Sequence, residues 1–359
     1  MARLGDYVKI KPGKLDANAS SENGQYPFFT CSVEPLKIDS YTYDCECVLV
    51  AGNGDLNVKY YNGKFDAYQR TYIIESKDKN VLSVPYLYCF LDKYVEELRK
   101  QSIGGVIKYI KLGNLTEAQI PMCSIEKQNE IVANLEKVND LISLRKQQLS
   151  KLDELVKSRF IELFGDINVN DKGWDIRPLG ELCTIVRGGS PRPIEKYLGG
   201  DIPWIKIGDA TDGENIYLHS TKEHIIQAGV SKSRMVKAGS LIFANCGVSL
   251  GFARIITFDG CIHDGWLAME DIDERLDKVF LLQALNQMTD HFRRIAPAGT
   301  QPNLNTAIMK AYKQIIPPVE LQREFIAFVE QVDKSKFEIQ KSFEKLETLK
   351  KALMEKYFG

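Results

Sequence analysis

The sequence contains one helix-sized segment twice, at residues 123–165 and again at residues 317–359. The two copies align without a gap at a constant offset of 194 positions, which places Gln128 opposite Gln322, and both copies end in Phe-Gly. An internal repeat constrains the fold more than any local pattern does, because each copy must occupy the same kind of place in the structure. The chain therefore consists of two halves, each made of a variable body followed by the same segment.

Both copies have the apolar spacing of an amphipathic helix, in steps of three and four residues. Their other positions carry balanced charge, with seven acidic and seven basic residues between Glu126 and Phe164 and eight of each between Glu320 and Phe358. At 1.5 Å per residue, about 40 residues form a rod of roughly 60 Å. We expect the two rods to pack against each other through Leu135, Val138, Ile142, Leu149, Leu152, Val329, Val332, Ile339, Phe343 and Leu346. The alternative is that each rod is a surface helix packed on its own body alone.

The two bodies, residues 1–122 and 166–316, have mixed strand and helix patterns that predict an α+β fold. Leu179-Gly180-Glu181 in the second body repeats Leu4-Gly5-Asp6 in the first. In the first body we expect a buried strand at 44–51, a hairpin turning at Asn62-Gly63, a strand at 68–74 and a helix at 84–100. In the second body we expect strands at 202–207, 239–244 and 252–258 and a helix at 277–295.

Composition narrows the class of protein. With 359 residues, 44% of them hydrophobic and 26% charged, the chain is long enough for two ordinary domains and has the make-up of a globular protein. The net charge is −1, so binding to nucleic acid would need local cationic patches rather than a global field. No apolar run approaches a membrane span and the first residues do not form a signal peptide, so we expect a cytoplasmic protein without membrane association. The eight cysteines include no CxxC pair and are expected to be reduced.

No catalytic motif stands out. The sequence lacks a P-loop, a GxGxxG fingerprint, an HExxH zinc motif, a GxSxG elbow and the Asp/Asn-Pro-Pro-aromatic tetrapeptide of DNA methyltransferases. The strongest metal candidate is His219 with His224, but their spacing does not suit one helical face, and we expect no metal site. An enzyme with an active site between the bodies, around His263, Asp264 and Arg254, stays open as an alternative, although a structural histidine is the plainer interpretation.

Cationic and amide side chains gather in loops of both bodies. Proteins read DNA bases with Arg or Lys on guanine and with Asn or Gln on adenine, and they hold phosphates with cations, hydroxyls and backbone N–H groups. The candidates in the first body are Tyr60, Tyr61, Lys64, Gln69 and Arg70. The candidates in the second body are Arg187, Ser190 and Arg192 in one Gly/Pro-framed loop, and Thr300, Gln301, Asn303 and Asn305 in an amide-rich loop. A solvated hairpin or surface turn has a similar composition, so these clusters do not establish DNA binding alone.

Several shared features surround the repeated helix. Three short features occur once in each half. A proline-containing segment precedes the helix, as Ile120-Pro121-Met122 and Ile316-Pro317-Pro318, and an E-x-Q motif lies near the helix start, as Glu126-Lys127-Gln128 and Glu320-Leu321-Gln322. Both copies of the helix end in Phe-Gly. With them, the repeated unit resembles the specificity subunit of type I restriction-modification systems over essentially the whole chain. Residues 26–30, 202–209 and 299–305 are similar to stretches of that family's target recognition domains.

The resemblance implies that the two bodies are target recognition domains, each reading one half of a split DNA sequence through the major groove. It implies that the two long helices pair antiparallel, with a pseudo-two-fold relation, as a spacer that sets the distance between the half-sites. The implied partners are double-stranded DNA, two modification subunits docked on the helices, and restriction subunits joined through them. The chain itself would hold no cofactor, and S-adenosylmethionine would bind in the modification subunit. A helical adaptor that binds only proteins stays open as an alternative.

Overall fold

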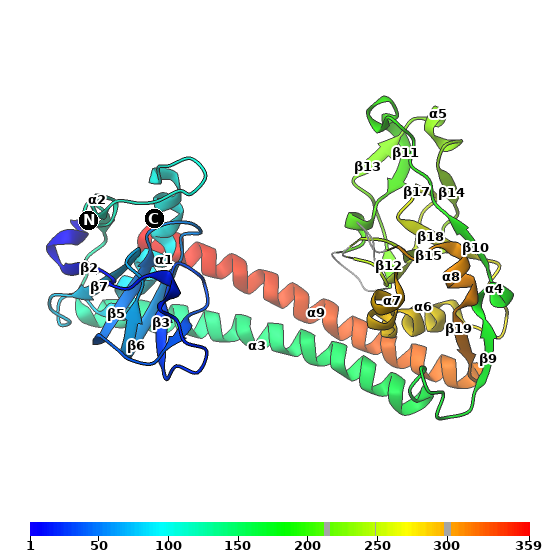
Figure 1. Ribbon diagram of the computed structural model, residues 1–359, viewed down its shortest axis with the longest axis horizontal. Coiled ribbons are helices and arrows are strands. Elements are labelled where there is room, and N and C mark those ends of the chain that lie inside the picture. Colours follow the sequence, from blue (N-terminus) through cyan, green and yellow to red (C-terminus); the bar gives the residue numbers. More distant parts are fainter. Residues whose placement is uncertain (212–215, 248, 298–302) are drawn as a thin grey trace. The chain divides into compact units, whose positions relative to one another are not determined.

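The computed structural model describes all residues except 212–215, 248 and 298–302. Its longest elements are two helices of 40 residues each, α3 (Ile125–Phe164) and α9 (Val319–Phe358) (Figure 1). Both lie within the duplicated segments, as their amphipathic spacing predicts.

The chain forms two compact units. The first unit consists of Met1–Gln148 together with Ile339–Gly359, and the second consists of Leu149–Glu338. Each unit therefore contains one body, one end of α3 and the opposite end of α9. Each body packs against parts of both long helices, which differs from the alternative of surface helices packed on one body alone.

Within each unit the two helices run antiparallel. In the first unit, Leu135 near the start of α3 shares a buried core with Phe358 at the end of α9, whereas Lys146 further along α3 lies over the Phe343 ring, 5.4 Å from its centroid. In the second unit Lys336 forms an ion pair with Asp153. Later along α3, Arg159 Nη2 donates to Glu324 Oε1 over 2.6 Å. The antiparallel helix pair of the predicted fold class is confirmed.

The positions predicted to pack the helices are all buried or half-buried. Those that are buried are Leu135, Val138, Ile142, Val329 and Val332. Those that are half-buried are Leu149, Leu152, Ile339, Phe343 and Leu346.

The body of the first unit is a curved sheet of six strands in the order β2-β7-β5-β6-β3-β4. All neighbours are antiparallel except β3 and β6, which are parallel. The strands are β2 (Val8–Pro12), β3 (Tyr26–Phe29), β4 (Leu36–Ile38), β5 (Tyr43–Ala51), β6 (Val58–Ala67) and β7 (Thr71–Ser76). The other elements are β1 (Ala2–Arg3), β8 (Gln119–Ile120), α1 (Val84–Gln101) and α2 (Leu112–Thr116), and β1 pairs with β8.

The hairpin predicted at Asn62-Gly63 is wrong. The β5–β6 pairing continues through Asn62, opposite Glu46, and through Gly63, opposite Cys45. The two strands turn instead at residues 52–57. The turn of a hairpin fixes the register of its two strands, so this pair cannot also turn at Asn62-Gly63. Gly63 serves a different purpose, because its φ of 138° allows a local distortion within the strand. Gln69 and Arg70 lie in the turn between β6 and β7 rather than in the predicted strand at 68–74.

Helix α1 covers one face of this sheet and supplies much of the core. It begins after Ser83, whose side chain accepts a hydrogen bond from the Tyr86 N–H, and Pro85 occupies its first turn. Tyr86 and Phe90 are buried against Phe358 of α9, with ring centroids 5.1 and 6.2 Å away. The core of the first body thus extends onto the end of the second long helix.

The body of the second unit contains two main sheets. Their strand orders are β10-β18-β15-β16-β12 and β13-β11-β17-β14. The strands of the first sheet are β10 (Thr184–Arg187), β12 (Tyr217–Leu218), β15 (Leu241–Ala244), β16 (Ala253–Ile256) and β18 (Trp266–Glu270). Those of the second are β11 (Leu198–Ile205), β13 (Glu223–Ile225), β14 (Arg234–Val236) and β17 (Gly260–Ile262). A further pair joins β9 (Asp175–Pro178) to β19 (Lys313–Ile316).

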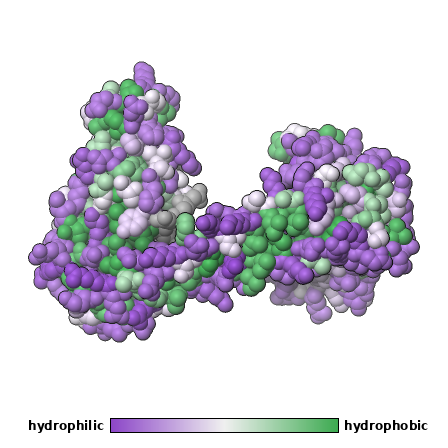
Figure 2. Space-filling model, turned by 180° about the vertical axis from the view of Figure 1, so that it is seen from behind, coloured by the Kyte–Doolittle hydropathy of each residue, from purple (hydrophilic) through white to green (hydrophobic). Residues whose placement is uncertain are grey.

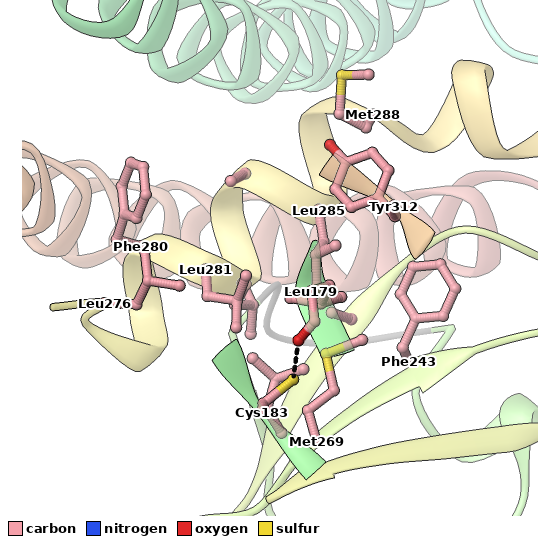
Figure 3. Packing of buried hydrophobic residues seen from close by; sticks show 14 of the residues in the cluster. Leu179, Cys183, Phe243, Met269, Leu276, Phe280, Leu281, Leu285, Met288 and Tyr312 are labelled. Carbon is pink, nitrogen blue, oxygen red and sulfur yellow. Dashed lines mark hydrogen bonds between the residues drawn. The ribbon is translucent and has the colours of Figure 1, made fainter. Parts of the chain in front are cut away.

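The helices of this body are short. They are α4 (Leu179–Leu182), α5 (Gln227–Val230), α6 (Lys278–Gln287), α7 (Thr289–Ile295) and α8 (Thr306–Ala311). The single helix predicted at 277–295 is broken at Met288 into α6 and α7. Figure 3 shows the core between these helices and the sheet, which includes Phe243 of β15, Met269 of β18 and Leu285 of α6. The eight cysteines are free, and burial raises the pKa of Cys183 to about 12.

The two bodies share one strand plan. The order β2-β7-β5-β6-β3 in the first corresponds to β10-β18-β15-β16-β12 in the second, and the last pair is parallel in both. Leu4 donates its N–H to the Ala118 oxygen over 2.8 Å, and Leu179 donates to the Tyr312 oxygen over 2.8 Å. The second body adds the sheet of β11, β13, β14 and β17. The predicted internal repeat is confirmed, and it includes the bodies as well as the helices.

Candidate nucleic-acid interface

In the second unit the predicted residues Arg187, Ser190 and Arg192 converge on Asp264. Arg187 ends β10, the other two lie in the loop that follows, and Asp264 lies in the turn between β17 and β18. Ser190 Oγ donates to Asp264 Oδ1 over 2.8 Å, and Arg192 Nη2 lies 3.6 Å from Asp264 Oδ2. Arg187 Nε donates to the main-chain oxygen of Asp264 over 3.1 Å. Asp264 thus contacts two cationic side chains and one hydroxyl group.

The two cations remain accessible. The Arg192 side chain is 82% exposed, and its carboxylate partner is 31% exposed. An ion pair in such a setting contributes little stability, because water screens it and the side chain loses entropy in forming it. A phosphate or a base edge can therefore compete with Asp264 for this guanidinium at small cost.

His263 borders this cluster as a neutral ring. Its Nδ1 accepts a hydrogen bond from the Gly265 N–H over 2.9 Å, so Nε2, 3.0 Å from Asp264 Oδ1, carries the proton. Burial lowers the pKa of His263; the carboxylate of Asp264 opposes the shift, and the cations of Lys206, Arg192 and Arg187 add to it. The ring is half-buried with its hydrogen bonds made, which is the arrangement of a structural histidine.

The residue corresponding to Asp264 in the first unit is Gln69. It lies in the turn before β7, as Asp264 lies in the turn before β18, and it contacts the loop after β2. Its N–H donates to the Leu15 oxygen over 2.9 Å, and its Nε2 donates to Asp16 Oδ1 over 3.0 Å. The neighbouring Arg70 is exposed, and among the described residues its side chain has no hydrogen-bond or ion-pair partner. Each unit therefore has a turn and a loop in contact at the same place in its sheet; the exposed cation is Arg70 on the turn in the first unit, and Arg187 and Arg192 at the strand end and loop in the second.

Two glycines hold these loops close to the sheet. Gly13 donates to the Thr71 oxygen and Gly188 to the Trp266 oxygen, each over 2.9 Å, so the two occupy the same register position. A Cβ atom at Gly13 would lie 2.3 Å from the Ala67 oxygen, and one at Gly188 would lie 2.1 Å from the His263 oxygen. No other residue allows such an approach of two backbones.

The structure does not bring Tyr60, Tyr61 and Lys64 to the turn of Gln69 and Arg70. Tyr60 Oη donates to Glu46 Oε1 over 2.8 Å, and its pKa is raised to about 12, first by burial and then by that carboxylate. Tyr61 packs edge-on against Phe65. Lys64 lies over the ring of Tyr41, 4.7 Å from its centroid. These three side chains are spread over β6 because they belong to a continuous strand and not to a hairpin tip.

The amide-rich loop is described only at its end. Thr300 and Gln301 lie outside the described residues. Asn303 Oδ1 accepts a hydrogen bond from Asn245 Nδ2 over 3.3 Å. Asn305 caps α8, because its side chain accepts from the Ile308 N–H over 2.9 Å. Both described amides thus position the loop within the fold.

Asn245 connects the two loops of the second unit, and the sequence did not single it out. It is fully buried, its N–H donates to the Gly265 oxygen over 2.9 Å, and its oxygen accepts from the Leu304 N–H over 2.8 Å. In the first unit Gly52 makes the same two bonds, to the Arg70 oxygen over 2.7 Å and from the Ile110 N–H over 2.9 Å. The only sequence signal for Asn245 was a polar residue directly after an apolar strand.

The alternative sites have weaker support. Arg254 is buried over the Phe252 ring, 4.8 Å from its centroid, and its Nη1 donates to the Ala253 oxygen over 2.8 Å. Burial lowers its pKa to about 10. Within the described part of the chain, no group of three or more His, Cys, Asp or Glu side chains is arranged to hold a metal ion. Among the same residues, no helix is long and apolar enough to cross a membrane.

Two bodies of one strand plan, each with exposed arginines on a turn or loop at the same place, define a duplicated recognition protein built on paired helices. A sequence match to the family described as "Type I restriction modification DNA specificity domain" covers residues 1–154 and 171–351. The Type I restriction enzyme EcoDI specificity subunit of Escherichia coli is 27% identical over 371 residues, spanning 92% of this chain and 80% of that protein. The MjaIX specificity subunit of Methanocaldococcus jannaschii is 24% identical over 299 residues, spanning 77% of this chain and 68% of that protein.

Solved structures of the same class share the fold. The S subunit of a type I restriction-modification system from M. genitalium has a TM-score of 0.62 at 18% identity, covering 100% of this chain and 95% of that one. A chain from a structure of the type I R-M system has a TM-score of 0.61 at 17% identity, covering 99% and 96%. The chain belongs to the family of type I restriction-modification DNA specificity domains. It is a specificity subunit, and its function is the recognition of DNA sequence.

Proposed function

We propose that each body reads one half of a bipartite DNA target through the turn and loop described above, while partner subunits carry out all catalysis. The observation that supports this proposal is the equivalence of the two clusters: Gln69 and Arg70 in the first unit correspond in place to Asp264 with Arg187 and Arg192 in the second. Two related bodies with different side chains at one place can recognise two different half-sites.

The chemistry of these clusters suits DNA. Arginine pairs bidentately with guanine and glutamine with adenine, and the remaining cations and hydroxyls hold phosphates. Arg70 and Arg192 are exposed, and the hydrogen bond that the Gln69 side chain makes to Asp16 uses its Nε2, which leaves Oε1 and the second N–H of the amide for a base. The contacts that specify bases in this proposal are those of Gln69, Arg70, Arg187 and Arg192 and of the loop at 300–305.

The long helices space the two bodies and dock two modification subunits. Figure 2 shows apolar side chains gathered on an exposed stretch of the helices. Exposed apolar residues of the helices are Leu141 and Leu144 in the first unit and Leu155, Ile161 and Phe337 in the second, which are 43% to 61% exposed. A contiguous apolar patch on an exposed helix surface is typical of a protein interface. In this proposal S-adenosylmethionine binds in the modification subunits, restriction subunits join through them, and the complex acts on DNA in the cytoplasm.

The test is sequence-specific binding by the chain purified together with its modification subunit. Arg70→Ala should weaken or relax recognition of one half-site, and Arg192→Ala or Gln301→Ala that of the other, each by about 1–3 kcal/mol. Assembly with the modification subunit should survive all three substitutions. If the wild-type complex showed no preference for any DNA sequence, the proposal would be rejected. Disassembly caused by Arg192→Ala without DNA would instead favour a helical protein adaptor.

A further inference from the structure

The loop that joins α1 to α2 in the first unit ends in an apolar tip. Val106 is 104% exposed and Ile107 is 63% exposed. The adjacent Lys108 and the nearby Lys111 are exposed as well. In Figure 1 this loop is the cyan segment that follows α1. Two neighbouring branched side chains held largely in water are costly, which points to a partner that covers them.

The loop is fixed at its base. Ile103 and Tyr109 exchange two backbone hydrogen bonds of 3.0 and 2.8 Å, and Gly54 donates to the Lys108 oxygen over 2.9 Å. Gly104 adopts a φ of 117°, and a Cβ atom there would lie 2.5 Å from the Ile107 oxygen. The tip is therefore presented by a defined turn that only glycine permits at this position.

This loop corresponds to the amide-rich loop of the second unit. The offset of 194 positions that relates the long helices also relates the start of α2 at Leu112 to the start of α8 at Thr306. It places residues 105–111 opposite residues 299–305. The flanking structure agrees, because the bridge between Asn53 and Tyr109 has its counterpart in the bridge between Cys246 and Asn303.

The loop also lies against the proposed DNA-reading turn of its own unit. Gly52 donates its N–H to the Arg70 oxygen over 2.7 Å and accepts at its own oxygen from the Ile110 N–H over 2.9 Å. Gly52 thus joins the turn that carries Arg70 to Ile110, in the segment that follows the loop tip. The exposed Lys108 and Lys111 follow the apolar tip in the sequence, and their charges suit a partner with negative charge at its edge.

We infer that residues 104–109 are a second base-contacting element of the first body, in which Val106 and Ile107 touch thymine methyl groups and Lys108 holds a phosphate. This inference rests on the proposed function, since it adds a reader to the same half-site. The occupant is double-stranded DNA, because the thymine methyl is the apolar group that the major groove offers and phosphates flank it. A protein partner on this tip would need no such neighbouring cations.

The experiment uses the complete complex of the chain with its modification subunit. The target is identified by mapping methylated sites in DNA, and binding to a duplex of that sequence is measured by fluorescence anisotropy. The double variant Val106→Ser/Ile107→Thr should bind the target at least about tenfold more weakly, the cost of one mismatched base pair. Replacing thymine by uracil, one position at a time, should weaken wild-type binding about fourfold at a contacted base, the worth of one buried methyl group. The double variant should not respond at that base.

Val169→Ser is the matched control, since Val169 is 73% exposed in the second unit and lies outside both proposed clusters. It should bind like the wild type. The inference is overturned if the double variant keeps wild-type affinity, or if no single uracil affects the wild-type complex. It is also overturned if the double variant fails to assemble with the modification subunit when DNA is absent, which would make the tip a protein contact. A wild-type complex without sequence preference would reject the proposed function itself, and with it this inference.

Discussion

Gln128 and Gln322 make the same three hydrogen bonds in their separate units. Gln128 Oε1 accepts from the Ser83 N–H over 3.0 Å, and its Nε2 donates to the oxygens of Val81 and Cys123 over 2.8 and 3.0 Å. Both glutamines are fully buried at the start of a long helix.

Gln322, 194 positions later, makes the three equivalent hydrogen bonds. Its Oε1 accepts from the Asp277 N–H over 2.8 Å, and its Nε2 donates to the oxygens of Arg275 and Pro317 over 2.8 and 2.7 Å. Ser83 caps α1 and Asp277 caps α6, so each glutamine joins the start of a body helix to the start of a long helix by hydrogen bonds.

We predict that Gln128→Met loosens only the first body. Methionine keeps the volume but removes three hydrogen bonds to part-buried backbone groups, at a cost of about 2–4 kcal/mol. Hydrogen exchange followed by mass spectrometry should show faster exchange at the start of α1, near residues 83–88. Gln322→Met is the matched variant and should speed exchange near residues 277–282. Faster exchange in both bodies for either variant would show that the hydrogen bonds of Gln128 and Gln322 do not act locally.

The glutamines also show how far the sequence could predict the fold. The side chains match at an offset of 194 over 123–165, and the structure extends this offset back to Val81 and Arg275. No similarity of side chains marks those positions, because the glutamine binds their carbonyl groups, which every residue has. The duplicated helix was therefore predictable residue by residue, whereas in the bodies the sequence showed the repeat only at Leu4-Gly5-Asp6 and Leu179-Gly180-Glu181, and its register elsewhere came from the coordinates.

Only part of the candidate site was predicted, because several of its contacts join residues that are distant in the sequence or involve main-chain groups. Arginines in a Gly/Pro-framed loop pointed to Arg187 and Arg192, but Asp264 is some 70 residues away; its main-chain oxygen accepts from Arg187 and its carboxylate pairs with Arg192. The roles of Gly52 and Asn245 rest on main-chain hydrogen bonds, which leave no side-chain pattern. The Asn62-Gly63 prediction failed because a turn signal also fits a distorted strand, and only the pairing with β5 decides between them.

The helix seam provides a second prediction. Leu152 packs against the core of the second unit, whereas Leu155, one turn further along the same helix, is 46% exposed. Leu152→Asp should destabilise the chain by about 3 kcal/mol, because the helix pair would bury an unpaired charge. Urea unfolding monitored by circular dichroism measures the loss.

Leu155→Asp is the matched control on the same helix. Its carboxylate stays in water, so the free energy of unfolding should change by less than about 0.5 kcal/mol. If Leu155 belongs to the proposed docking surface, this variant should still weaken assembly with the modification subunit. Equal destabilisation by both substitutions would contradict the assignment of the seam.

The close approach at Gly188 leads to a third prediction. Gly188→Ala would place a methyl group 2.1 Å from the His263 oxygen, so β10 or the turn that carries Asp264 must move. We expect a loss of about 1–3 kcal/mol in unfolding free energy, together with weaker recognition of the half-site that Arg192→Ala affects. Gly208→Ala is the control, because a Cβ atom there meets nothing within 4 Å. A Gly188→Ala variant as stable as Gly208→Ala would show that the backbones separate without cost.

The neutral ring of His263 predicts how stability depends on pH. Burial lowers its pKa below the ordinary 6.5, so as the pH falls the unfolded chain takes up this proton before the folded chain does. The stability that the neutral ring contributes is therefore fully present above pH 6.5 and is lost progressively as the pH falls below it. Protonation at Nδ1 would also break the hydrogen bond from the Gly265 N–H.

His263→Asn isolates this contribution, because its Oδ1 can still accept from Gly265 but cannot take up a proton in this range. Urea unfolding of both proteins at pH 7.5, 6.5 and 5.5 gives the difference in unfolding free energy between wild type and variant. That difference should shift in favour of the variant as the pH falls, since only the wild type must hold an imidazole neutral between Asp264 and the cations of Lys206, Arg192 and Arg187. A difference that stays constant over this range would mean that the folded and unfolded chains bind the His263 proton equally. A shift in favour of the wild type would mean that Asp264 outweighs burial and that the folded state prefers the charged ring.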